Sequence, residues 1–235
     1  MPSKPRSATA ARRAVAPGLA GLAVALVLIG LALPRCLAAW NDHAGAAALW
    51  DLRAGKPGPD PAILAAAGES LVASARRPPR GEVLADGGYL LARAAENTAD
   101  PARRAALSRA ALVATERGLA LAPANASAWA RLAALRANVG DRDGAAAALR
   151  VSFLAGPVVP ALTASRLDLA LALLPALDGE TRVLLDRQIR ITWILEPARI
   201  ARLAEDRRLG RLIGLALDGV SEEDLTLYRR AHPTP

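Results

Sequence analysis

The feature that most constrains this chain is an uncharged apolar run near its N-terminus, AVAPGLAGLAVALVLIGLALP, which spans Ala14–Pro34. At about 1.5 Å of rise per residue, a helix of this length crosses a hydrocarbon layer about 30 Å thick. Four basic residues precede the run, namely Lys4, Arg6, Arg12 and Arg13. Because basic flanks stay on the cytoplasmic side, we expect a cytoplasmic tail in residues 1–13, a transmembrane anchor in residues 14–34, and the remainder across the membrane.

A cleaved secretory signal is the alternative to a retained anchor. The apolar part of such a signal is usually about 7–15 residues long and ends at small residues, so this longer run favours retention. The segment Cys36-Leu37-Ala38 still offers small residues, and cleavage after Ala38 would release a chain that begins at Ala39. The single cysteine cannot form a disulfide within the chain, so packing alone must hold the domain together.

The charge balance follows from the same N-terminal feature. The chain carries 30 Lys and Arg residues against 22 Asp and Glu, for a formal net charge of +8. Five of the basic residues lie in the first 35 positions, where there is no acidic residue, so the rest of the chain is nearly balanced. The excess charge therefore reflects membrane topology, and we expect no nucleic-acid partner.

Beyond the apolar run, composition predicts an all-α domain. Alanine, leucine and arginine dominate, aromatic residues make up 3% of the chain, and runs of β-branched residues are few. Proline and glycine divide this part into segments of helical length. We expect a juxtamembrane helix and a Pro/Gly linker in residues 35–60, a helical repeat domain in residues 61–197, and capping helices with a tail in residues 198–235.

The segment between Pro123 and Pro157 carries a repeat signature. The two prolines lie 34 residues apart, and each follows an apolar helix end. The repeat signature between them is carried by Trp129, Leu132, Ala133, Gly140-Asp141 and Ala145. Their residue types and spacing resemble the tetratricopeptide repeat, a pair of antiparallel helices in which a bulky residue wedges the helices and small residues let their backbones approach.

The resemblance is less complete elsewhere. Arg136 stands where the family usually has an aromatic residue, and Ser152 replaces a small apolar residue. The neighbouring segments Glu82–Pro123 and Pro160–Pro197 fit the pattern more loosely. An ordinary helical bundle with one chance spacing is the alternative interpretation. The resemblance implies an all-α solenoid of stacked helix pairs with capping helices at its ends.

The resemblance also implies a partner-binding surface, since such repeats bind peptides or proteins along the concave side formed by successive first helices. In the matched repeat this face would present Ser127, Ala130, Arg131, Ala134 and Asn138. The alanines leave no clamp for a terminal carboxylate, so we expect a shallow, mostly apolar groove suited to a helix or an extended segment. The alternative is that these five residues only pack against the preceding repeat.

Sequence motifs for chemistry are lacking. The two histidines, His43 and His232, are far apart, and no His/Cys/carboxylate spacing suggests a metal site. No phosphate-binding, dinucleotide or nucleophile-elbow motif occurs, so we expect no cofactor, no metal and no enzymatic activity.

Three hypotheses follow. Low lysine with high arginine and alanine usage is typical of a GC-rich bacterium, so the far side of the membrane would be the periplasm. The first hypothesis is a single-pass inner-membrane scaffold that binds other envelope proteins or peptides, for example in polysaccharide export or secretion. The second is a periplasmic enzyme or enzyme accessory whose signal is removed. The third makes the anchor itself the functional part, through a Gly21-x-x-x-Ala25 helix contact.

Overall fold

A computed structural model of the chain describes residues 8–56, 60–76 and 78–232, of which residues 8–20, 38, 41, 44 and 207 are described by their backbone alone. Within these residues it contains helices and no β-strand, which confirms the predicted all-α class. The helices are α1 (Ala8–Arg53), α2 (Pro61–Ser74), α3 (Gly81–Glu96), α4 (Pro101–Leu121), α5 (Ala126–Asn138), α6 (Arg142–Ala155), α7 (Pro160–Ala172), the 3-10 turn η1 (Leu174–Ala176), α8 (Gly179–Leu195), α9 (Pro197–Ala204), α10 (Arg207–Asp218) and α11 (Glu222–Ala231).

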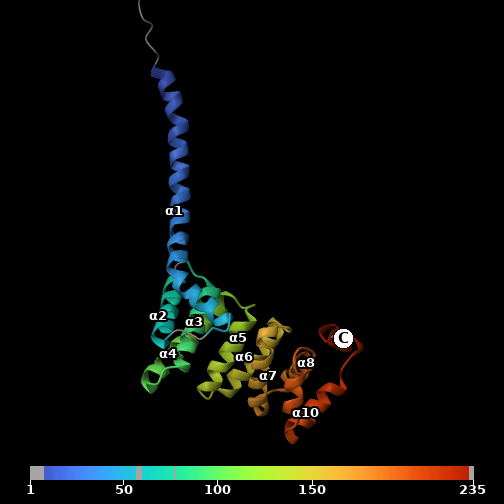
Figure 1. The fold of residues 1–235 in the computed structure, drawn as a ribbon. Helices are drawn as coiled ribbons and strands as arrows, with labels where there is room; N and C mark the ends of the chain where they lie inside the picture. The colour runs from blue at the N-terminus through green and yellow to red at the C-terminus, as the bar shows by residue number, and fades with distance from the viewer. Residues whose placement is uncertain (1–7, 57–59, 77, 233–235) are drawn as a thin grey trace, which may run out of the picture.

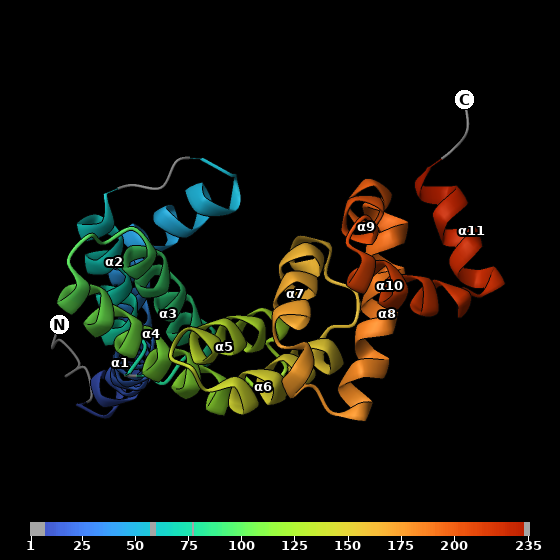
Figure 2. The same ribbon diagram turned by 90° about the horizontal axis from the view of Figure 1, so that it is seen from below.

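The helices of the domain follow one another in a row. Each packs chiefly on its neighbours in sequence, most closely α2 on α3, α3 on α4 and α5 on α6. Helices α3, α5 and α7 also contact one another in that order. Figure 2 shows the resulting arrangement, which extends from α2 at one end to α11 at the other instead of closing around a single centre.

Helix α1 has two different surroundings. Its N-terminal part projects from the domain on its own (Figure 1), and the large apolar side chains between Leu22 and Leu37 are each more than half exposed. Its last turns pack against α2 and α3, where Ala48 and Leu49 are buried. Among the residues whose side chains are described, no helix is long and apolar enough to cross a membrane. The predicted anchor in residues 14–34 is only partly covered by this statement, because the side chains of residues 14–20 are not described.

A polar cluster ties α1 to the turn between α2 and α3. The carboxylate of Asp42 accepts hydrogen bonds from the hydroxyl of Ser74 and from both terminal nitrogens of Arg80. Burial raises the pKa of Asp42, but the hydrogen bonds and the charge of Arg80 lower it further, so the pKa lies below its ordinary value. The ionised carboxylate is therefore favoured, and it fixes the direction in which α1 leaves the domain.

Local sequence explains where several helices begin and end. Asp60 and Asp100 each precede a proline, and each carboxylate accepts the backbone N–H two residues later, at 2.7 and 3.0 Å. Ser221 and Asp224 form the reciprocal capping box at the start of α11. Helix α5 is followed by Gly140, whose positive φ of 86° lets the chain turn back into α6.

Glycines allow α3 and α4 to cross at very short range. A Cβ added to Gly118 of α4 would lie 2.8 Å from both the carbonyl oxygen of Gly81 and the backbone nitrogen of Ala85. A Cβ on Gly88 of α3 would lie 2.5 Å from the hydroxyl oxygen of Thr115. Two backbones therefore meet where only glycine leaves room, and the order of these contacts makes the two helices antiparallel.

Four of the ion pairs between helices have a nearly constant spacing in sequence. Their partners lie 30 to 34 residues apart in sequence. The pairs are Arg53–Asp86, Glu69–Arg103, Arg150–Glu180 and Asp168–Arg199. Most of these side chains are exposed, so each pair adds about 0–1 kcal/mol to stability. Their spacing indicates the period at which helices follow one another in the row.

Candidate partner-binding surface

The five residues predicted to bind a partner all lie on α5, the first helix of the matched repeat. Ser127, Ala130, Arg131 and Ala134 are half-buried, and Asn138 is exposed at the end of the helix. Of the five, Arg131 reaches furthest, since its side chain extends across to α3. The predicted face of α5 is thus next to α3 and not isolated on the outside of the domain.

Arg131 is held on α3 by two contacts. Its Nη1 donates a hydrogen bond to the carbonyl oxygen of Ala85 at 2.5 Å, and its guanidinium carbon lies 4.6 Å from the ring centroid of Tyr89. A guanidinium at this distance over an aromatic face is a cation–π contact, worth about 0.5–2 kcal/mol. The two contacts therefore fix the positions of both the Tyr89 ring and the Arg131 guanidinium.

Burial lowers the pKa of Arg131 to about 10, although the charges of Asp86 and Tyr89 act in the opposite direction. Arg53 adds to the lowering, because it places a second cation nearby. The guanidinium stays charged at neutral pH, in a setting where water screens it poorly.

The surface continues onto α1. Arg53 forms an ion pair with Asp86 at 3.2 Å, and one turn earlier on α1 stands Trp50, which is 72% exposed. Tryptophan, tyrosine and arginine are the residue types enriched at binding hot spots, and this part of the domain carries all three. We name this surface the α1–α3–α5 face, and it consists of Trp50, Arg53, Asp86, Tyr89 and Arg131.

Sequence reasoning found only one member of this face. Trp50 and Arg53 lie in the stretch that we assigned to a juxtamembrane helix and linker, and α3 drew attention only as a loosely matched repeat helix. A signal was present in the sequence of α3, because its charged residues and its tyrosine recur at helical spacing on one side. That stripe consists of Glu82, Asp86, Tyr89, Arg93 and Glu96.

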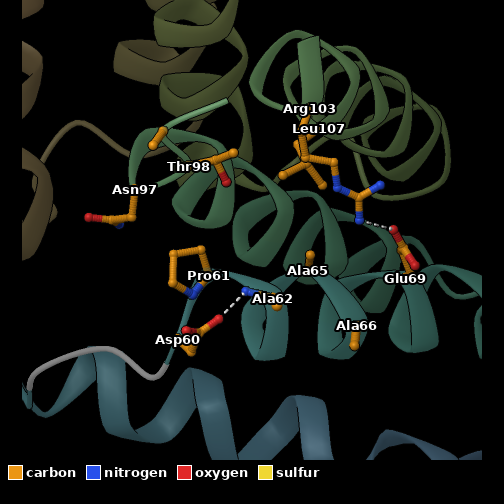
Figure 3. A pocket seen from close by; sticks show the side chains of 11 residues that line it. Asp60, Pro61, Ala62, Ala65, Ala66, Glu69, Asn97, Thr98, Arg103 and Leu107 are labelled. Atoms are coloured by element: carbon orange, nitrogen blue, oxygen red, sulfur yellow. Dashed lines mark hydrogen bonds and ion pairs between the residues drawn. The ribbon is translucent and has the colours of Figure 1, made fainter. Parts of the chain in front are cut away.

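A separate pocket of about 360 Å³ lies between the start of α2, the loop after α3 and the first turns of α4 (Figure 3). The carboxylate of Asp60 caps α2, and Glu69 pairs with Arg103 at 3.5 Å. Asn97 and Thr98 hydrogen-bond to backbone carbonyls of α3. The polar groups around this pocket are therefore engaged with their own neighbours, and their arrangement does not point to a ligand.

The described side chains bring together no group of three or more His, Cys, Asp or Glu residues that could hold a metal ion. Cys36 is exposed on the projecting part of α1. His43 is exposed on α1, and the Nε2 of His232 lies 2.8 Å from the carbonyl oxygen of Ile194 at the other end of the domain. The two histidines are thus on opposite ends of the row of helices.

No protein-family model matches this chain, and no curated protein or solved structure is significantly similar to it.

Proposed function

We propose that this chain is a single-pass scaffold of the bacterial cell envelope, with a periplasmic, tetratricopeptide-like domain that binds a segment of another envelope protein on the α1–α3–α5 face. The observation that carries this proposal is helix α1. One part of the helix is an exposed apolar rod, and the other is built into the core of the helical domain. A single helix that joins two such environments connects a membrane to a binding domain.

The exposed apolar part of α1 supports a membrane anchor. The large side chains from Leu22 to Leu37 expose more than half of their surface, over a length that has no charged residue before Arg35. Soluble proteins rarely expose a contiguous apolar surface of this extent, whereas lipid would cover it at no cost. Together with the basic residues before the run, this supports an anchor with the domain outside the cytoplasm.

Sequence spacing and helix contacts both support tetratricopeptide-like repeats. The 34-residue phrase from Pro123 to Pro157 coincides with the helix pair α5 and α6. Ion pairs join neighbouring pairs at a spacing of 30 to 34 residues, and α3, α5 and α7 contact one another in order. These are the features expected of stacked repeats that bury their faces on each other.

The composition of the α1–α3–α5 face supports a protein partner. Trp50 is 72% exposed, Arg53 follows it three residues later on α1, and Arg131 lies on α5 with Arg53 close enough to lower its pKa. Helices α1 and α5 also carry small residues, including Ala46, Ala47, Ala130 and Ala134. A shallow surface with one large aromatic anchor suits the side of a helix or an extended segment.

The proposal is tested by site-specific photocrosslinking in the native host. A crosslinking residue is placed at Trp50 on the proposed face, and in parallel at Val183, which is 66% exposed on α8, as the matched control. We expect a discrete crosslinked envelope protein from position 50 and none from position 183. Equal, diffuse crosslinking at both positions would count against a binding face on α1, α3 and α5.

A variant then measures the strength of the contact. Trp50→Ala removes the exposed ring without opening a cavity, so the domain should stay folded. If Trp50 is the anchor, the affinity for the crosslinked partner should fall about 30-fold or more, which corresponds to about 2 kcal/mol. Val183→Ala should leave it unchanged. Unaltered affinity of the Trp50 variant would contradict the assignment.

A further inference from the structure

We propose that Arg166, on α7, is the receptor for a carboxylate that enters beneath the loop joining α6 to α7. The side chain of Arg166 is 1% exposed, and among the fully buried side chains that the structure describes it is the largest. This site is distinct from the α1–α3–α5 face, and nothing in the inference depends on the function proposed above.

The guanidinium of Arg166 has an unused edge. Its Nη1 donates to the carbonyl oxygen of Gly156 at 2.7 Å, but its Nε and Nη2 are buried without a hydrogen-bond partner. In a guanidinium the Nε–H and the Nη2–H point in the same direction and form a two-pronged fork. A carboxylate matches that fork with its two oxygens, in a bidentate pair.

The charge of Arg166 also lacks an anion nearby. Burial lowers its pKa, and no acidic group acts on it to raise the pKa again. The arrangement is unlike that of the ion-paired arginines described elsewhere in the structure, which are Arg53, Arg80, Arg93, Arg103, Arg136, Arg150, Arg190 and Arg199. An unpaired buried cation is strongly unfavourable, and a bidentate carboxylate removes that penalty.

The surroundings of Arg166 favour a small, planar anion over a bulky one. The ring centroid of Phe153 lies 5.9 Å from its guanidinium carbon. Gly156 has no side chain, so the position 3.8 Å from Nη2 that a Cβ would take is left free. A planar carboxylate can lie in the plane of the fork beside the ring and use both of its oxygens, which a tetrahedral phosphate does less readily. The ligand class that the site selects is therefore a carboxylate.

Access requires the loop to move. Gly156 to Val159 form an irregular connection in which Pro157 and Val158 are exposed. A pocket of about 60 Å³ already opens between this loop and α8, lined among others by Phe153, Pro157 and Gln188. Phe153 borders both this pocket and the guanidinium of Arg166. Displacement of its ring, or of the loop, would connect the pocket to the guanidinium. Exposed Leu154 and Val158 then flank the entrance with apolar surface.

Thermal unfolding of the full chain in detergent tests the inference. The unfolding midpoint is followed against sodium acetate, with sodium chloride at matched ionic strength as the reference and inorganic phosphate as a second anion. Acetate should raise the midpoint in a saturable manner, and phosphate should do so less. An acetate effect no larger than that of chloride, or a larger effect of phosphate, would overturn the carboxylate assignment.

Three variants locate the effect. Arg166→Met removes the fork and should abolish the acetate effect, and Arg166→Lys keeps the charge without the fork and should raise the half-saturating concentration at least tenfold. Arg109→Met, at an exposed position on α4, should behave like the unmodified chain. An equal acetate response in Arg166→Met and the unmodified chain would refute the site.

A measurement on the unmodified chain avoids any dependence on how well the variants fold. Hydrogen exchange of the amides of Gly156, Val158 and Val159 should slow on addition of acetate and not of chloride, because the bound carboxylate would hold the loop closed. Unchanged exchange in this loop would contradict the inference. A short peptide with a free C-terminal carboxylate, compared with its amidated form and with a peptide carrying an internal Glu, then shows whether the carboxylate is borne by a small molecule, a chain end or a side chain.

Discussion

The close crossing of α3 and α4 makes a quantitative prediction about Gly118. In Gly118→Ala the new Cβ would meet two backbone atoms at 2.8 Å, the carbonyl oxygen of Gly81 and the nitrogen of Ala85. Backbone atoms cannot rotate away as a side-chain end can, so the two helices must separate. Overpacking of this kind costs about 1–3 kcal/mol, while replacing glycine by alanine within a helix gains about 1 kcal/mol.

The matched control is Gly214→Ala on α10, because a Cβ at that position meets nothing within 4 Å. This variant keeps the gain in helix propensity without the clash, so it should be stabilised by about 1 kcal/mol. Both variants share the gain in helix propensity, so it cancels when their unfolding free energies are subtracted. The remaining difference is the cost of separating α3 from α4. We expect Gly118→Ala to be less stable than Gly214→Ala by about 1–3 kcal/mol.

The assay is urea unfolding of the full chain in detergent, followed by circular dichroism at 222 nm. A difference of about 1–3 kcal/mol should appear as a lower denaturation midpoint for Gly118→Ala at an unchanged slope. Equal midpoints for the two variants would show that α3 and α4 do not approach as closely as described, and the account of this crossing would then be wrong.

Three further predictions concern the two ends of the domain and the matched repeat. Asp42→Asn should destabilise the docking of α1 by about 1.5–3 kcal/mol at neutral pH, measured by hydrogen exchange in residues 45–52. The pKa of Asp42 is lowered in the folded chain, so its contribution to stability is fully present above its ordinary pKa of 3.8 and is lost as the pH falls through the folded pKa. The Asn variant should not show this loss of stability in acid. Tyr228→Ala should remove the ring stacked 4.4 Å from Trp193 and cost about 0.5–1.5 kcal/mol beyond the lost burial; unchanged hydrogen exchange in α11 would contradict that contact. Ser152→Ala should leave the carbonyl oxygen of Ala126 without its 2.7 Å donor and cost about 1 kcal/mol in urea unfolding, whereas a neutral effect would mean that water replaces the hydroxyl.

Parts of the fold could be predicted because they follow from local chemistry. Composition predicted the all-α class, and Asp100-Pro101 and Ser221–Asp224 are local patterns typical of helix starts, where the structure indeed begins α4 and α11. The path of α1 was harder to anticipate. The sequence shows where the apolar run ends. The attachment of the helix to the domain, however, depends on the ion pair between Asp42 and Arg80, which lies 38 residues later.

The two departures from the tetratricopeptide pattern have structural reasons. Arg136, where the family usually has an aromatic residue, reaches Glu116 on α4 at 2.9 Å and the carbonyl oxygen of Gly144 on α6 at 3.3 Å. Ser152 donates to the carbonyl oxygen of Ala126 across the helix pair. Both polar residues join neighbouring helices, a role that a single-sequence pattern match cannot reveal because their partners are remote.

The residues of the two proposed binding sites were the hardest to predict from the sequence, for a similar reason. Arg131 was identified by its position on the expected face, but its neighbours on α1 and α3 become neighbours only through packing. Arg166 was not singled out at all, since burial of an arginine cannot be recognised from its place in a helix. What the sequence lacks in both cases is the identity of the side chains that surround a charge.

The most direct test of the central claim is the intact mass of the mature chain from its native host, measured together with membrane fractionation. The anchored scaffold predicts a chain that retains residues 14–34, sediments with membranes and is released only by detergent. A soluble chain that begins near Ala39 would contradict the anchor and favour a secreted periplasmic protein.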